Sequence, residues 1–380
     1  MKTSSIIFAA FAATVMGAPA PAPRPQDIDL SSLSFSSDDL PTGPEFGANK
    51  ESIPVSKPTT NDIVEDIKDD PASPTRKLRR GVNTLLKRVP GDCAPQSINN
   101  GPQFINLEPD DWQAAVELAY PATNPPTIGP YKKVFDGLRG SVNQIGYRGL
   151  TTLHAYDINA CKTLCDKKAQ CLGFNFYVER DPSLDPGDLC PNPSIITNYK
   201  CTLWSFPFLA GAADNIGETR KQFKVVIAAS VGYVKPFVAS NLANFTSFGQ
   251  DLYGSINAPL LDGVNSYLGV KSYPSGDVNV DYFEPAVCAA ACDAQTAYNS
   301  RHHASTPCQY KACNFFDAYV VLKDGKAQGL TCTLYTWTWD DSYAVNGGQT
   351  RSDGVYKVAS SYTYTNSRLP APPYINTCPV

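Results

Sequence analysis

The chain has 380 residues, 42% of them apolar and 18% charged, with a formal net charge of −4. The low charge content argues against a coiled coil, and the absence of a long basic tract argues against a nucleic-acid-binding protein. Twelve cysteines, an even number, are typical of a disulfide-bonded protein from an oxidising compartment. The composition therefore predicts a secreted, loop-rich protein.

The first 17 residues have the pattern of a signal peptide. Lys2 precedes an apolar run over residues 6–16, and small residues follow it. Eleven apolar residues are too few to span a bilayer, so we expect cleavage after Gly17. No later segment is long and apolar enough to form a membrane span. We therefore expect a secreted, extracellular protein.

Residues 18–88 read as a disordered propeptide. They are rich in Pro, Ser and Asp and contain no Cys, Trp or Tyr. Such a segment cannot bury enough apolar surface to offset its chain entropy. Dibasic pairs end at Arg80 and Arg88, which predicts removal of the propeptide at these sites. The alternative is a basic linker that is never cut.

An internal duplication organises the rest of the chain. In both copies, 19 residues separate the Cys of a Cys-Thr-Leu motif from the Arg of an Asn-x-Gly-x-Thr-Arg motif. We expect an N-terminal extension over 89–130, two tandem modules over 131–236 and 237–368, and a tail over 369–380. The paired segments are Cys161–Cys165 with Cys288–Cys292, Cys171–Tyr177 with Cys313–Tyr319, Cys201–Trp204 with Cys332–Tyr335, and Asn215–Arg220 with Asn346–Arg351.

Each copy predicts one helix and a small antiparallel sheet. Asp157 suits the N-cap of a helix that carries Cys161 and Cys165 on one face, and Glu284 and Pro285 suit the start of its counterpart. Two disulfides that join helix and sheet would account for four cysteines in each module. The expected fold class is α+β. Apolar, aromatic-rich runs predict strands at 171–178, 201–208 and 223–228, and at 313–322, 332–339 and 355–358.

This cysteine pattern resembles the PAN/apple module family. The segments 175–182, 222–229 and 313–315 are more specifically similar to secreted fungal apple-like proteins, often labelled fruit-body-specific. The resemblance covers about residues 131–368 and implies modules that bind proteins or carbohydrates without catalysis. It also implies the pairs Cys161–Cys201, Cys165–Cys171, Cys288–Cys332 and Cys292–Cys313.

Four cysteines have no place in that pattern. For these we expect a Cys93–Cys378 clasp and a Cys190–Cys308 cross-link, although sequence by itself does not determine connectivity.

Sequence motifs for catalysis or cofactor binding are absent, so we expect no enzyme and no cofactor. A carboxylate-rich loop contains Asp181, Asp185 and Asp188, which makes it a weak Ca²⁺ candidate. Its spacing does not match an EF-hand, and two prolines make an ordinary turn-rich loop the alternative. The one glycosylation sequon begins at Asn244, in the connector between the modules.

Aromatic residues alternate along one predicted strand of each module. Period two places each trio on one face, where it would form either a stacking surface for sugars or a second core layer. Recurrence in both copies favours the core, and Trp337 and Trp339 are the better candidates for exposure because Asp340 and Asp341 follow them. The repeated Arg could contact a ligand or brace a turn. The binding candidates are Trp204, Tyr335, Trp337, Trp339, Arg220 and Arg351.

The sequence therefore favours a secreted, non-catalytic binding protein of a fungal cell wall or surface. Its partner would be a cell-wall polysaccharide or an extracellular protein. One alternative is a secreted effector or elicitor that acts on a host. A further alternative is a glycan-active enzyme, which would require two carboxylates facing one another across a cleft.

Overall fold

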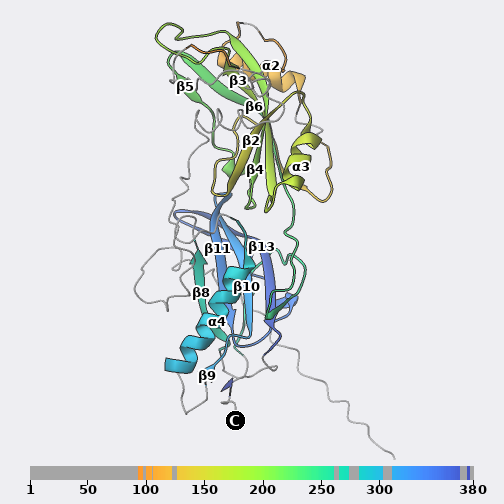
Figure 1. Cartoon of the computed structure of the whole chain (residues 1–380), viewed down its shortest axis with the longest axis vertical. Coiled ribbons are helices and arrows are strands. Elements are labelled where there is room, and N and C mark those ends of the chain that lie inside the picture. Colours follow the sequence, from red (N-terminus) through yellow and green to blue (C-terminus); the bar gives the residue numbers. More distant parts are fainter. Residues whose placement is uncertain are drawn as a thin grey trace, which may run out of the picture.

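The computed structural model describes residues 93–96, 100–104, 106–121, 126–260, 265–273, 282–302, 310–368 and 375–376. The predicted signal peptide and propeptide, with Gly17, Arg80 and Arg88, lie outside these residues, as do Cys308 and Cys378. Two sheet-containing units lie one above the other along the long axis (Figure 1). Within the described residues, no helix is long and apolar enough to cross a membrane.

Module 1 is built on a six-stranded antiparallel sheet. The strand order is β1-β6-β3-β4-β2, and the short strand β5 pairs with the start of β6. Its elements are α2 (Pro109–Ala119), β1 (Lys132–Leu138), β2 (Tyr147–Leu153), α3 (Ile158–Lys167), β3 (Gly173–Pro182), β4 (Ile195–Trp204), the 3₁₀ helix η3 (Ala210–Ala212), β5 (Glu218–Arg220) and β6 (Phe223–Val234).

Module 2 repeats this topology. Its strand order is β12-β13-β10-β11-β8, β7 pairs with the end of β13, and β9 and β14 form a separate two-stranded sheet. The β9–β14 register pairs Lys311 with Ile375 and Tyr310 with Asn376. Its elements are β7 (Phe245–Ser247), β8 (Tyr267–Tyr273), α4 (Pro285–His302), β9 (Tyr310–Lys311), β10 (Phe315–Lys323), β11 (Lys326–Tyr335), η4 (Asp341–Tyr343), β12 (Gly348–Arg351), β13 (Gly354–Asn366) and β14 (Ile375–Asn376).

The duplication extends to individual hydrogen bonds. Asn175 on β3 accepts a hydrogen bond from the backbone N–H of Val142 at 2.9 Å. Asp317, at the same place on β10, accepts one from the N–H of Ile256 at 2.8 Å. The two-module α+β architecture expected from the sequence is therefore present.

Disulfides attach each helix to its sheet. Asp157 caps α3 by accepting a hydrogen bond from the N–H of Ala160, as expected. Spacing of four residues then points both helix cysteines toward the sheet. The four disulfides implied within the modules are confirmed: Cys161–Cys201, Cys165–Cys171, Cys288–Cys332 and Cys292–Cys313.

The partners predicted for Cys93 and for Cys190 are wrong. Cys93 bonds to Cys190, which excludes both Cys93–Cys378 and Cys190–Cys308. The reason is that the N-terminal extension runs along the β3–β4 loop, where the N–H of Gln96 donates to the carbonyl of Ser183 at 2.8 Å. The disulfide therefore fastens the extension to module 1.

The helix side of each sheet forms the main core. In module 1, Phe174, Phe176 and Val178 alternate along β3 and face α3. Helix α2 adds Trp112 to this core, and the side chain of Gln113 donates to the carbonyl of Ile227 at 2.7 Å. The opposite face of β3 carries polar residues that loops cover.

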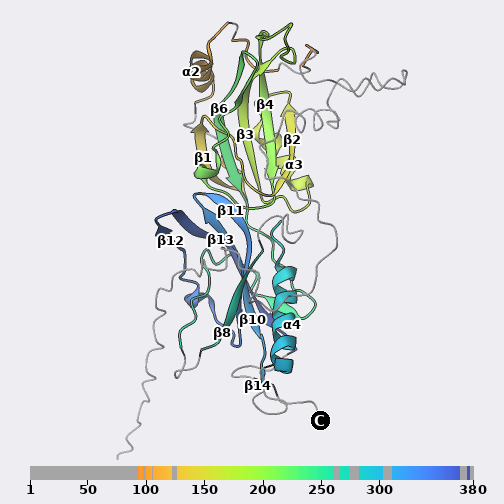
Figure 2. The same ribbon diagram turned by 90° about the vertical axis from the view of Figure 1, so that its left-hand side faces the viewer.

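The two modules meet through the turn between β10 and β11, which contacts the loop after β4 (Figure 2). The N–H of Leu209 donates to the carbonyl of Gly325 at 2.9 Å, and the N–H of Ala327 donates to the side chain of Gln144 at 2.9 Å. Lys326 also forms an ion pair with Asp214. Leu172 and Phe206 of module 1 belong to a buried cluster that is otherwise built by module 2.

Candidate functional site

The predicted aromatic binding residues are buried. Trp337 and Trp339, expected to be the most exposed, have relative exposures of only 9% and 6%. The indole N–H of Trp339 donates to Ser266 Oγ at 3.1 Å, and its ring packs edge-on against Tyr343. Trp204 and Tyr335 are also buried. An exposed stacking surface is therefore wrong, and the alternating aromatics form the second core layer, because loops cover this face of each sheet.

The repeated Asn-x-Gly-x-Thr-Arg motif braces a turn. The Asn215 side chain donates to Ser141 Oγ at 2.9 Å, and the backbone of Asn346 pairs with Ser255 in the same way as Asn215 pairs with Ser141. Arg220 is half-buried and donates to Glu218 at 2.6 Å, whereas Arg351 is exposed on β12. The arginines therefore lie in different environments despite the shared motif.

Module 1 contains a buried cluster of ionisable side chains. Glu179 and Asp181 share one face of β3, and Lys200 Nζ lies 3.5 Å from Glu179 Oε2 and 3.2 Å from Asp181 Oδ2. Burial and the neighbouring Asp181 raise the pKa of Glu179 to about 8. Burial opposes ionisation of Asp181, but Lys200, Arg220 and a hydrogen bond from Asn198 hold its pKa below the usual value. We infer an Asp181–Lys200 ion pair beside a protonated Glu179.

The three aspartates of the predicted calcium loop make contacts with different parts of module 1. Asp181 pairs with Lys200 inside the sheet, and exposed Asp188 pairs with Lys221 at 2.8 Å. Asp185 meets the N-terminal extension through its carbonyl, which accepts from the N–H of Cys93. Among the described residues, no group of three His, Cys, Asp or Glu side chains could hold a metal ion. The weak calcium interpretation is therefore not supported.

Module 2 has a buried carboxyl at the place that Asn175 holds in module 1. Asp317 is fully buried, and burial raises its pKa to about 7. It accepts hydrogen bonds from the N–H of Ile256 and from Ser361 Oγ at 2.8 and 2.9 Å. Asn175 performs the same task in module 1, where its Nδ2 donates to Ser230 Oγ at 2.9 Å. Both modules thus use this position to hold the loop that crosses the sheet.

The sequon at Asn244 lies in the turn before β7. Asn244 is half-buried, and its side chain hydrogen-bonds to Asp293 of α4. A glycan at this position would have to displace that contact. Glycosylation of Asn244 stays a prediction.

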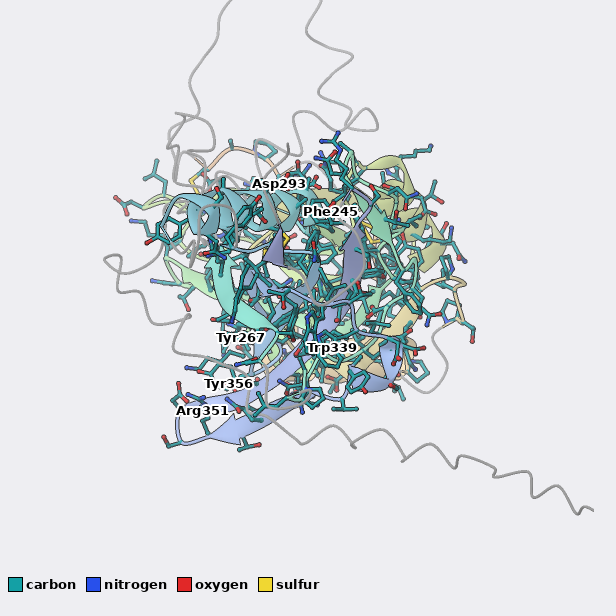
Figure 3. All side chains as sticks on the ribbon, turned by 90° about the horizontal axis from the view of Figure 1, so that it is seen from below. Phe245, Tyr267, Asp293, Trp339, Arg351 and Tyr356 are labelled. Carbon is teal, nitrogen blue, oxygen red and sulfur yellow. A yellow bond between two sulfur atoms is a disulfide. The ribbon has the colours of Figure 1, made fainter. Side chains whose placement is uncertain are left out.

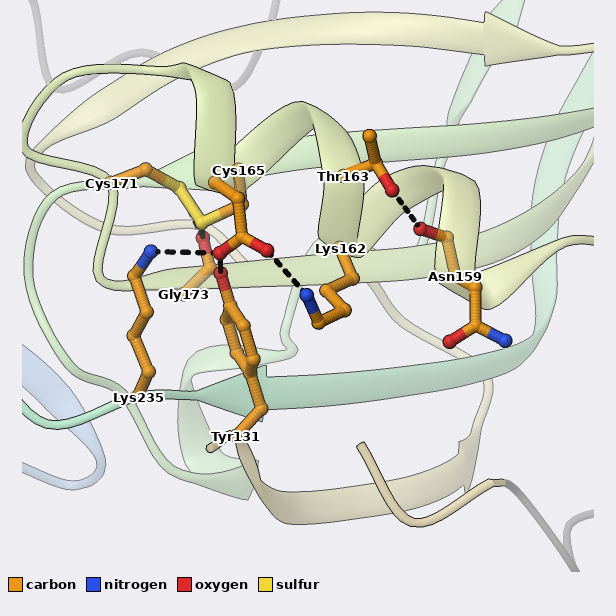
Figure 4. Close-up of polar contacts among 9 residues, drawn as sticks. Tyr131, Asn159, Lys162, Thr163, Cys165, Cys171, Gly173 and Lys235 are labelled. Atoms are coloured by element: carbon orange, nitrogen blue, oxygen red, sulfur yellow. Dashed lines mark hydrogen bonds and ion pairs between the residues drawn. A yellow bond between two sulfur atoms is a disulfide. The ribbon is translucent and has the colours of Figure 1, made fainter. Parts of the chain in front are cut away.

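A surface cluster of lysines surrounds one carboxylate of module 1. Tyr131 Oη donates to Asp166 at 2.7 Å, Lys235 Nζ lies 3.1 Å from the same carboxylate, and Lys162 pairs with it one helical turn away. Figure 4 shows Tyr131, Lys162 and Lys235 converging beside the Cys165–Cys171 disulfide. Partial burial opposes ionisation, but these three hydrogen bonds lower the pKa of Asp166 to about 2.

The lysine cluster extends over three separate segments. Both ammonium groups also lie over the ring of Tyr131, at 5.9 Å for Lys162 and 5.2 Å for Lys235. The four further lysines are exposed and flank Tyr131 or Asp166 in the chain. We call this surface the lysine face; it comprises Lys132, Lys133, Lys162, Lys167, Lys168 and Lys235.

Module 2 keeps the framework of this face but none of its lysines. Phe245 stands at the place of Tyr131, and both rings pack on an equivalent Phe of the sheet. Asp293 likewise stands at the place of Asp166 (Figure 3). Strand register and helix spacing give the residues that replace the six lysines as Thr246, Ser247, Ala289, Ala294, Gln295 and Asn366.

The charge of the two modules differs accordingly. Residues 131–236 contain 13 Lys and Arg against 9 Asp and Glu, a formal charge of +4. Residues 237–368 contain 8 against 11, a charge of −3. The net charge of the whole chain hides this asymmetry. Aligning the repeats and asking which charges are not duplicated would have revealed the lysine face.

Comparison with known proteins gives no relative: no family model, no curated protein and no solved structure matches this chain.

Proposed function

We propose that this protein is a secreted, non-catalytic binding protein and that the lysine face of module 1 binds an acidic polysaccharide of the cell wall. The observation that carries the proposal is the difference between the repeats. Six lysines of module 1 lie on β1, on and just after α3, and after β6, and each is neutral at the equivalent place in module 2. Since module 2 forms the same framework without them, folding does not require these lysines.

The chemistry of the face suits a polyanion with spaced carboxylates. Lysine ammonium groups are mobile point charges with three donors each, and they do not require the planar geometry that arginine recognises. The Asp166 carboxylate keeps Lys162 and Lys235 beside Tyr131, while Lys132, Lys167 and Lys168 remain exposed. Because exposed charges are screened by salt, binding should weaken as ionic strength rises.

Other observations support the extracellular location, the PAN/apple-like identity and the non-catalytic role. Five disulfides among the described residues fit an oxidising, extracellular location. The helix-to-sheet disulfides and the duplicated sheet support a PAN/apple-like identity. Burial of Glu179 and Asp181, paired with Lys200, supports a binding role over glycan hydrolysis, since a substrate would need access to both carboxyls.

The test is retention of the secreted protein on insoluble polygalacturonate, with chitin and neutral β-glucan in parallel. A Lys167→Glu/Lys168→Glu double variant should lose retention at least tenfold on the acidic polymer. Lys311→Glu/Lys357→Glu is the matched control, because it changes the net charge equally at exposed positions of module 2.

Equal loss in both variants would show general charge attraction and refute the lysine face. Preferential retention on a neutral polymer would refute the acidic ligand. Released sugars are measured in the same samples, and their appearance would overturn the non-catalytic assignment.

A further inference from the structure

Module 2 carries its own copy of the surface with which module 1 holds module 2. In module 1 this surface consists of the loop through η3 and the segment before β2, and it receives the β10–β11 turn. The equivalent part of module 2 is the loop through η4 and the segment 253–260, which we call the η4 surface. The equivalent pairs are Arg139 with Tyr253, Gln144 with Ala258, Ala212 with Tyr343, and Asp214 with Val345.

The η4 surface carries exposed apolar side chains beside the exposed carboxylates of Asp340 and Asp341. Val345 is 52% exposed, Leu260 59% and Tyr253 74%. Val345 and Tyr253 lie close together because the residues next to them, Ala344 and Gly254, are in contact. A Cβ atom added to Gly254 would lie 2.6 Å from the carbonyl oxygen of Ala344. In module 1 the same pair of positions holds Asp214 and Arg139. Exposed apolar side chains that lie side by side, as Val345 and Tyr253 do, are typical of a docking surface.

The junction between the modules shows which kind of segment docks on the η4 type of surface. Phe206 of module 1 is fully buried because it joins the cluster built by module 2. Trp337 stands at the equivalent place in module 2 and retains 9% exposure. The occupant in module 1 is the turn between two central strands, β10 and β11. The equivalent hairpin of module 1 is the β3–β4 loop.

The β3–β4 loop lies at the opposite end of the molecule from the η4 surface. The C-terminal end of β4 reaches the junction, so its N-terminal end lies a strand length away, about 30 Å for ten residues. In module 2 the strand that enters at the junction is β11, so the η4 surface follows at its far end. The β3–β4 loop carries Leu189, which is 96% exposed.

We propose that copies of this protein associate head to tail, with the β3–β4 loop of one copy seated on the η4 surface of the next. The contact would repeat between chains the arrangement already present within the chain. A contact between different surfaces is open-ended, and so chains rather than closed dimers are expected.

Sedimentation velocity over a concentration series tests this proposal on the secreted protein. The wild type should show species that grow with concentration beyond a dimer. Leu189→Asp and Val345→Asp should each weaken association at least tenfold. Val238→Asp is the matched control, since Val238 is 86% exposed in the connector between the modules, away from both ends, and it should leave association unchanged.

Mixing the two variants is the decisive experiment. The Leu189→Asp chain keeps an intact η4 surface and the Val345→Asp chain keeps an intact loop tip, so together they should form a dimer and stop. A mixture that stays monomeric, or a wild type that stays monomeric at all concentrations, overturns the proposal. Leu189→Ser and Val345→Ser repeat the test if either Asp variant fails to fold.

This inference is independent of the polysaccharide proposal. Monomeric Leu189→Asp should keep its affinity per chain for short oligogalacturonate, since the lysine face lies on α3 and β1. Failure of one proposal therefore leaves the other intact.

Discussion

Replacing Asp317 with Asn should make module 2 more stable at neutral and alkaline pH. Asp317 is fully buried and its pKa is about 7, compared with 3.8 for an exposed carboxyl. Burial is the largest cause. The hydrogen bonds from Ile256 N–H and Ser361 Oγ oppose the increase without cancelling it, and Asp251 adds to it. The folded state therefore binds a proton at pH values where the unfolded chain has lost it.

The direction and the size of this change in stability follow from the linkage between proton binding and folding. Below pH 3.8 the carboxyl is protonated in both states and costs nothing. Stability falls as pH rises from 3.8 to about 7, and the loss then levels off. At about 1.36 kcal/mol per pH unit, the interval corresponds to about 4 kcal/mol. Asn removes this cost and can donate to Ser361, as Asn175 donates to Ser230.

The assay is thermal unfolding by calorimetry at pH 4, 6 and 8, with hydrogen exchange of β10 peptides to report on module 2 alone. D317N should exceed the wild type by up to about 4 kcal/mol at pH 8 and match it near pH 4. Asp188→Asn, in an exposed loop, is the control and should leave the free energy of unfolding unchanged at both pH 8 and pH 4. An unchanged pH dependence in D317N, or destabilisation at pH 8, would refute the reasoning.

Further predictions concern the buried acid of module 1, the buried indole and the last two cysteines. Glu179→Gln should raise the free energy of unfolding above pH 8 and leave it nearly unchanged below the usual carboxyl pKa, as measured by urea titration. The reason is that a carboxyl with a raised pKa in the folded state lowers stability as the pH rises. Trp339→Ala should cost about 3–5 kcal/mol in the same titration, since it empties a buried site; an unchanged midpoint with weaker glycan retention would restore the stacking hypothesis. The described disulfides use ten of the twelve cysteines, so non-reducing peptide mapping should find Cys308 joined to Cys378, and a free thiol at either would contradict this.

The local pattern of the chain predicted much of the fold. Helix spacing places Cys161 and Cys165 on one face, and strand period separates Leu203 from Trp204, so each module's helix and strands follow from short-range rules. These elements depend on residues close together in sequence, where spacing determines geometry. The duplicated motifs supplied the two-module architecture, and the family resemblance implied the disulfides within each module.

Long-range features were decided only by the tertiary structure. Cys93 pairs with Cys190 because the extension runs along the β3–β4 loop, and no spacing rule predicts a contact across 97 residues. Trp337 and Trp339 are buried because loops distant in sequence cover that face of the sheet, a fact that period two cannot show. The lysine face also joins three segments. Alignment of the repeats shows which lysines are not duplicated, but only the fold of the chain brings Lys162 and Lys235 to Asp166.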